Sequence, residues 1–324
     1  VDLALWDIKG KHLGVPVWEL LGGKSRDKVR LYLLMGGDTP ESAATNARAA
    51  VDDGFTAIKF DPIPHGYGDM TLHALVAGVE ANVEAARDAV GGRADIILEL
   101  HRKLTPLHAI PVAEAVRRFQ PLFIEDPIQI DSIQSQGEIS KRINAPFANG
   151  ERLHTIWEFR ELLVAGGTQF VRPDVGLAGG LTHVKKIAAI AESFHAAVVT
   201  HNFLTPLLTA ASIHLDVSIP NFVAISASDG ERPSSCSRSL IAVSIERERD
   251  RTLRGTQSSA RRLSKMAPRI RGIAYVSNFT FSVGVKRSMA CTKPTMPEET
   301  KSLVSTRLGK PAARRPATNL TSDA

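Results

Sequence analysis

Short apolar segments that end in a carboxylate recur along this chain at equal intervals. Glu99 lies in IILELH, Glu125 in LFIEDP and Glu151 in FANGERL, and 26 residues separate each glutamate from the next. That interval is about the length of one strand, one helix and two loops. Parallel strands joined in this way bring their carboxyl ends to one face of a barrel. The spacing therefore predicts that the three carboxylates converge at one barrel mouth.

Three converging carboxylates repel one another unless a cation lies between them. Oxygen ligands suit a hard divalent ion, so we expect Mg²⁺ first and Mn²⁺ second. The alternative for any single acid is a helix N-cap or a salt bridge, because acidic residues favour the first turn of a helix. The equal spacing of three acids favours the metal site over that alternative.

Strands and helices alternate regularly between residues 25 and 223. VRLYLLM is predicted to be a strand, residues 39–54 a helix with Thr39 as its N-cap and Pro40 at its first position, and TAIKFD the second strand. Further strands are expected at ADIILEL, LFIED, PFANGE, QFVRPD and AAVVTH, each followed by a helical pattern, and NFVAIS is a candidate eighth strand. This alternation predicts an α/β fold, a TIM-like (β/α)7β barrel.

Composition changes near residue 223. From Val223 onward the chain has 19 Lys and Arg against 8 Asp and Glu, and all ten histidines and all three tryptophans precede that point. We therefore expect three parts: residues 1–24 as the helical end of a preceding domain, 25–223 as the barrel, and 224–324 as a basic tail rich in Ser and Arg, disordered or non-native.

Two interpretations of that tail compete. It is either a disordered basic extension that binds nucleic acid nonspecifically, or sequence without evolved structure, such as an altered reading frame. The abrupt change inside the expected eighth strand and the lack of a nucleic-acid motif favour the second, so nucleic acid is not an expected partner. Within the tail, SIERERDRTLRG could form a short helix and GIAYVSNFTFSVGV a hairpin.

Several functional classes are excluded by what the sequence lacks. There is no run of about 18 apolar residues and no export signal, so we expect a cytoplasmic protein with no membrane partner. Cys236 and Cys291 are the only two cysteines, and their spacing supports neither a disulfide framework nor a zinc site.

Four more polar residues lie at the ends of predicted strands. Lys59 ends the second strand, and His101 follows Glu99 by two residues, hence on the same face if the strand stays extended. Asp174 and His201 end the adjacent strands six and seven, where a carboxylate can hold one ring nitrogen of an oriented general base. Taken singly, each could be a solvated or structural residue, but their joint placement favours chemistry. Seven further histidines lie in loops or on helices and are assigned no chemistry, namely His65, His73, His108, His154, His183, His195 and His214, and GLAGGL is predicted to be a turn.

From residue 1 to about 222 the chain resembles the enolase superfamily, in its mandelate racemase subgroup, and most closely the sugar-acid dehydratases that act on galactonate or gluconate. The resemblance rests on ALWDIKGKHLGVPVWELLGG, GFTAIKFDP, IILELHRKLTP, LFIEDP, NGERL, RPDVGLAGGLT and VTHN. It implies that residues 1–24 are the last helices of an α+β capping domain of which most is lacking. It also implies a small sugar acid as substrate and leaves a homo-oligomer open.

The resemblance also implies roles for particular residues. The metal ligands would be Glu99, Glu125 and Glu151, and the catalytic residues would be His101, His201, Asp174 and Lys59. His201 would remove the proton α to the substrate carboxylate and His101 would protonate the departing hydroxyl, giving a 2-keto-3-deoxy acid. Lys59 would help electrostatically near the substrate carboxylate. We find no counterpart of the family's strand-eight glutamate near NFVAIS, since Asp229 and Glu231 come too late.

Two alternatives to dehydration stay open. One is a racemase or epimerase of the same superfamily, although its Lys-x-Lys base is only half present because Phe60 and Asp61 follow Lys59. The other is an inactive barrel remnant whose basic tail accounts for any binding. Sequence does not select the aldonate.

Overall fold

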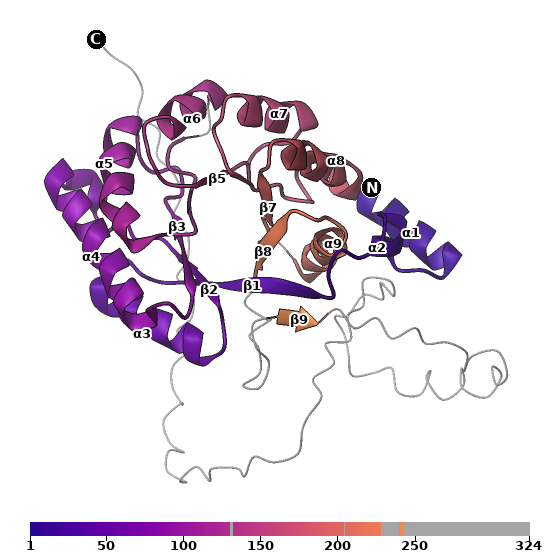
Figure 1. Cartoon of the computed structure of the whole chain (residues 1–324), viewed down its shortest axis with the longest axis horizontal. Helices are drawn as coiled ribbons and strands as arrows, with labels where there is room; N and C mark the ends of the chain where they lie inside the picture. Colours follow the sequence, from indigo (N-terminus) through magenta and orange to yellow (C-terminus); the bar gives the residue numbers. More distant parts are fainter. Residues whose placement is uncertain (130–131, 204, 228–239, 243–324) are drawn as a thin grey trace, which may run out of the picture. The chain divides into compact units, whose positions relative to one another are not determined.

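Eight parallel strands close into a barrel within residues 1–129, 132–203, 205–227 and 240–242, the part of the chain that the computed structural model describes (Figure 1). The strands are β1 (Lys28–Met35), β2 (Ala57–Phe60), β3 (Asp95–Glu99), β4 (Phe123–Glu125), β5 (Phe147–Asn149), β6 (Phe170–Val171), β7 (Ala197–Thr200) and β8 (Phe222–Ser226). Each strand pairs in parallel with the next, and β1 pairs with both β2 and β8. The predicted TIM-like barrel is confirmed, with the candidate eighth strand in place.

The helices lie outside the ring of strands (Figure 1). They are α1 (Asp2–Leu13), α2 (Val17–Leu20), α3 (Pro40–Asp52), α4 (Leu72–Val90), α5 (Pro106–Val116), α6 (Ile133–Ser140), α7 (Ile156–Val164), α8 (Gly180–Ser193) and α9 (Pro206–Asp216), with 3₁₀ turns at Tyr67–Asp69 and Arg117–Phe119. Among the described helices, none combines the length and the apolar composition that a membrane span requires.

Local sequence signals determine where these helices begin. The Thr39 side chain accepts a hydrogen bond from the backbone N–H of Ser42, and Pro40 occupies the first helical position, as predicted. Thr155 and Glu158 form a capping box at the start of α7. The predicted turn in GLAGGL is present, since Gly179 takes the left-handed conformation at φ 85° directly before α8.

One layer of inward-facing apolar side chains lies inside the barrel. Tyr32, Ala57, Ile97, Phe123, Ala148, Val199 and Ala224 form a buried cluster of their own, contributed by seven different strands. A second, larger apolar cluster includes residues of the helices and of the opposite faces of the strands. Because side chains alternate along a strand, residues two positions beyond an inward residue also point inward. This parity directs the polar residues at the strand ends into the barrel mouth.

The first two helices pack on the last helices of the barrel. The Trp6 indole Nε1 donates to Thr182 Oγ1 at 2.9 Å, and the Thr182 backbone N–H donates to Asp2 Oδ2 at 3.2 Å. The Trp18 backbone N–H donates to His214 Nδ1 at 3.2 Å. His214, one of the histidines assigned no chemistry, thus joins α2 to α9.

A ninth strand, β9 (Leu240–Ala242), pairs antiparallel with β1. It falls in the segment expected to be a tail, and the expected boundary between residues 223 and 224 falls inside β8. The helix predicted at SIERERDRTLRG, the hairpin predicted at GIAYVSNFTFSVGV, both cysteines, Asp229 and Glu231 lie outside the described residues. The division into three parts stays a prediction.

Candidate active site

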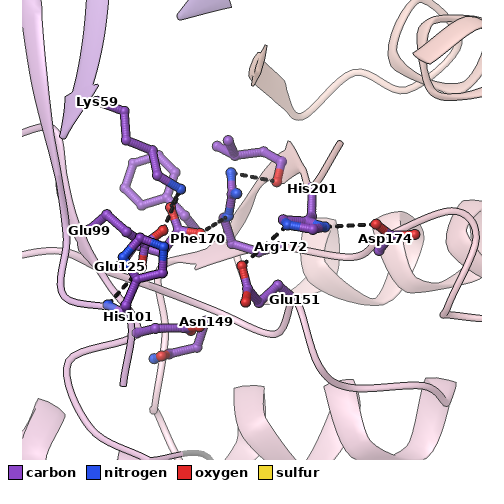
Figure 2. A network of polar contacts seen from close by, with 12 residues as sticks. Lys59, Glu99, His101, Glu125, Asn149, Glu151, Phe170, Arg172, Asp174 and His201 are labelled. Carbon is purple, nitrogen blue, oxygen red and sulfur yellow. Dashed lines mark hydrogen bonds and ion pairs between the residues drawn. The ribbon is translucent and has the colours of Figure 1, made fainter. Parts of the chain in front are cut away.

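The polar residues at the barrel mouth point into the barrel and lie directly above the inward-facing apolar layer. Lys59, Glu99 and Glu125 each lie two residues beyond an inward residue of the same strand, namely Ala57, Ile97 and Phe123. Arg172 likewise follows Phe170, a residue packed against the same layer. Figure 2 shows these side chains converging from different strands. The sequence pattern thus determines both their depth and their direction.

The three glutamates with equal spacing meet in space. Glu99, Glu125 and Glu151 each offer one carboxylate oxygen, and these oxygens lie within 4.8 Å of one another. Glu99 and Glu125 stand opposite each other in the register of β3 and β4, whereas Glu151 follows β5 after the turn at Gly150. An all-oxygen donor set at this spacing fits a hard divalent ion. The geometry therefore meets the requirement that the sequence spacing predicted.

Buried cations face two of these carboxylates. Lys59 Nζ lies 2.5 Å from Glu99 Oε2 and 2.6 Å from Glu125 Oε2, and Arg172 Nε lies 2.7 Å from Glu125 Oε1. Burial alone would raise the pKa of Glu125, but Arg172 and Lys59 lower it to about 2. Burial and the nearby charge of Glu125 raise the pKa of Glu99. The site thus holds one firmly ionised carboxylate beside one that is harder to ionise.

A third cation bridges the remaining acids. The Arg102 guanidinium forms ion pairs with both Glu151 and Asp126. Burial, followed by the charges of Glu125 and Glu99, raises the pKa of Asp126 well above its ordinary value. Its Oδ1 is buried with no hydrogen-bond partner among the described residues. Asp126 therefore resists ionisation beside the three glutamates.

Asp174 and His201 form the oriented pair that the sequence indicated. His201 Nδ1 lies 2.7 Å from Asp174 Oδ2, and the two residues are paired across an isolated parallel bridge. Asp174 Oδ1 accepts the backbone N–H groups of Gly176 at 2.7 Å and Leu177 at 3.1 Å, so the carboxylate is held from both sides. The other ring nitrogen of His201 lies 3.4 Å from Glu151 Oε2 and faces the mouth. This nitrogen is placed to exchange a proton with a substrate.

His101 reaches the mouth by a different route from the one expected. The condition of an extended strand is not met, because β3 ends at Glu99 and His101 takes the left-handed conformation at φ 50°. Its backbone N–H donates to Glu99 Oε1 at 3.0 Å, which holds the turn. The ring Nδ1 lies 3.1 Å from Asp61 Oδ2. This hydrogen bond is the largest of the influences that raise the pKa of His101.

Sequence reasoning missed four polar residues of the site. Arg172 and Asp61 could have been found from parity, since each lies two residues beyond an inward position on its own strand. Arg102 and Asp126 give no such signal, because both take left-handed backbone conformations at φ 60° and φ 45° just past their strands. The sequence does not show that Arg102 and Asp126 lie close to Glu151, and their position is seen only in the structure.

Comparison with known proteins assigns the chain to a family. The family described as enolase C-terminal domain-like matches residues 42–251, well over half of the chain. The chain belongs to the enolase superfamily. Residues 1–22 match the N-terminal domain of mandelate racemase and muconate lactonizing enzyme, which is the resemblance stated for the first two helices.

Relatives within the enolase superfamily include sugar-acid dehydratases. D-galactonate dehydratase of Variovorax paradoxus is 37% identical over 227 residues, covering 69% of this chain and 58% of the relative. D-gluconate dehydratase of Thermoproteus tenax is 36% identical over 223 residues, covering 68% of this chain and 45% of the relative. A crystal structure of an enolase-superfamily member from Salmonella Typhimurium is 32% identical, with a TM-score of 0.68, and the match covers 71% of this chain and 64% of that one.

The resemblance to the enolase superfamily and its sugar-acid dehydratases is thereby confirmed. The chain spans about half the length of the two curated relatives. Enolase-superfamily enzymes bind a divalent metal ion, and the three glutamates supply the donor set that such an ion requires.

Proposed function

We propose that this chain dehydrates a sugar acid to a 2-keto-3-deoxy acid in a reaction that depends on a divalent metal ion, Mg²⁺ first and Mn²⁺ second. The observation that carries the proposal is the convergence of three carboxylate oxygens within 4.8 Å beside two imidazoles, each held through Nδ1 by an aspartate. The dehydratase relatives support the same reaction class. The substrate class is an aldonate such as galactonate, gluconate or arabinonate.

The chemistry requires stabilisation of negative charge. A proton α to a carboxylate is too weakly acidic for an unaided imidazole, and a divalent ion held by Glu99, Glu125 and Glu151 would supply electrostatic stabilisation as the proton leaves. Lys59 contributes positive charge to the site, since its ammonium group is buried against Glu99 and Glu125. In the free chain it therefore neutralises the proposed metal ligands, in addition to the role near the substrate carboxylate inferred from the resemblance.

The two histidines divide the proton transfers. His201, held by Asp174, accepts the C2 proton at its Nε2 as the C2–H bond breaks. His101, protonated, donates a proton to the C3 hydroxyl as the C3–O bond breaks, so one water leaves. The enol product then takes up a proton at C3 and releases the proton of its C2 hydroxyl, which gives the 2-keto-3-deoxy acid. No external oxidant or reductant is required.

Product formation and proton exchange test the proposal together. The chain is incubated with Mg²⁺ and a panel of aldonates in deuterated water, and both the keto acid and deuterium at C2 are measured by NMR. We expect His101→Asn to lose keto-acid formation but keep C2 exchange, and His201→Asn to lose both. His73→Asn, an exposed site on α4, is the control. Exchange at C2 without keto acid in the unaltered chain would identify a racemase. The absence of both keto acid and C2 exchange would refute the proposal.

A further inference from the structure

We propose that Asp61 is the positioning residue of His101, so that the barrel mouth holds two carboxylate–imidazole pairs rather than one. The inference rests on the proposed function, in which His101 is the general acid. It starts from Asp61, a residue just past β2 that the family resemblance left without a role. The contact that suggests it is the 3.1 Å distance between Asp61 Oδ2 and His101 Nδ1.

Contacts other than the one to His101 also hold the Asp61 carboxylate in place. Its Oδ1 accepts the backbone N–H of Ile63 at 3.0 Å, a local turn that sets the side-chain direction. Its Oδ2 also lies 2.5 Å from Lys103 Nζ, and the side chain is 23% exposed. Burial alone would raise the pKa of Asp61, but hydrogen bonds from His101 and Lys103 lower it. The group is therefore an ionised acceptor with both oxygens engaged.

The backbone around His101 brings the ring to that acceptor. His101 and Arg102 both have positive φ, 50° and 60°, a conformation that few non-glycine residues adopt. The His101 N–H donates to Glu99 Oε1 at 3.0 Å, and the Arg102 N–H donates to the backbone carbonyl of Asp126 at 2.9 Å. The turn thus directs the ring away from the line of β3 and toward the end of β2.

The acceptor decides which ring nitrogen remains for the substrate. A carboxylate can only accept, so Nδ1 of His101 must carry the proton of this hydrogen bond, and Nε2 is left for the substrate. The same division holds at His201, whose Nδ1 faces Asp174 at 2.7 Å. Both histidines therefore offer Nε2, each held from behind by an aspartate.

The simpler role for Asp61 is a salt bridge with Lys103 on the rim of the barrel. Both residues line a cavity of about 470 Å³ beside the ends of β1 and β2, which also includes Asp69. A rim salt bridge alone would leave the tautomer of His101 and the dehydration rate unaffected. These two quantities therefore separate positioning from a structural role.

Asp61→Asn in the full chain is the discriminating variant. If its side-chain oxygen stays on the Ile63 N–H, the amide NH₂ replaces the acceptor and faces His101 Nδ1. We expect kcat for dehydration to fall about 10- to 100-fold, the usual effect of losing such a supporting carboxylate, with KM and C2 proton exchange nearly unchanged because His201 is untouched. Asp61→Glu should recover part of the rate. Asp69→Asn, an exposed acid on the same rim, is the charge-matched control.

A second measurement does not depend on activity. In the chain labelled with ¹⁵N-histidine, the His101 ring signals are assigned by their loss in His101→Asn. We expect Nδ1 of His101 to be protonated in the unaltered chain and to lose that proton in Asp61→Asn, whose Tm is measured in parallel. An unchanged tautomer, or full dehydration activity in Asp61→Asn, would overturn the inference. An unaltered chain with the expected tautomer but with neither keto acid nor C2 exchange would instead refute the proposed function.

Discussion

Replacing Lys59 by Met tests how much the stability of the fold depends on the cation between Glu99 and Glu125. The Lys59 side chain is 7% exposed, and its partners Glu99 and Glu125 are 2% and 0% exposed. Methionine has a similar length but no charge, so the substitution leaves two facing carboxylates without the cation between them. Arg172 remains on the other oxygen of Glu125 and only partly compensates.

The size of the effect follows from burial. Removing one partner of a buried ion pair costs about 3–5 kcal/mol, because an uncompensated charge stays in the interior. The same loss makes the site more attractive to an added cation. A divalent ion at 100 times its Kd stabilises the folded state by about 2.7 kcal/mol. Lys59→Met should therefore be strongly destabilised without metal and should regain more stability from Mg²⁺ than the unaltered chain does.

Urea denaturation with EDTA and with excess Mg²⁺ measures both quantities. Lys186→Met, on the exposed face of α8, controls for the loss of one lysine. The reasoning is refuted if Lys59→Met is as stable as the control in EDTA. It is equally refuted if Mg²⁺ stabilises the variant less than the unaltered chain.

Three further predictions test the surroundings of the site. Arg172→Met should cost about 3–5 kcal/mol in thermal denaturation, because Glu125 stays buried and keeps only Lys59 as an ion-pair partner; a loss below about 1 kcal/mol would contradict this. Thr155→Ala should cost about 1 kcal/mol in urea by removing the capping box of α7, and an unchanged midpoint would argue against that cap. Burial raises the pKa of Asp216 well above its usual value despite a hydrogen bond from Thr200. As pH rises above about 4 the unfolded chain loses this proton first, so stability falls until the pH reaches the folded pKa. Asp216→Asn should flatten that fall in urea titrations carried upward from about pH 4, and an equal slope would contradict the sign.

Periodic features of the fold could be predicted from sequence. The strand-helix alternation, the N-cap at Thr39 and the equal spacing of Glu99, Glu125 and Glu151 are all local patterns, and the barrel turns each into a position in space. The pairing of Asp174 with His201 followed from the adjacency of their strands. These predictions needed no knowledge of side-chain packing.

The rest of the site lies on irregular backbone, where the sequence shows no periodic pattern that predicts a conformation. His101, Arg102 and Asp126 all have positive φ although none is glycine, so no local signal announced their conformation. The side-chain direction of His101 was inferred only for a strand that stays extended, whereas His101 turns toward Asp61. The cost of such a turn is repaid only by contacts with neighbouring strands, and those contacts exist only after the barrel has closed.

Direct titration with Mn²⁺ tests the central claim, that three evenly spaced glutamates hold one divalent ion. Isothermal titration calorimetry should give one ion per chain, with competition by Mg²⁺. Glu151→Gln should weaken binding at least 10-fold. Glu138→Gln, an exposed acid on α6, should leave binding unchanged. Equal affinity in Glu151→Gln and the unaltered chain, or no binding by the unaltered chain, would contradict the claim.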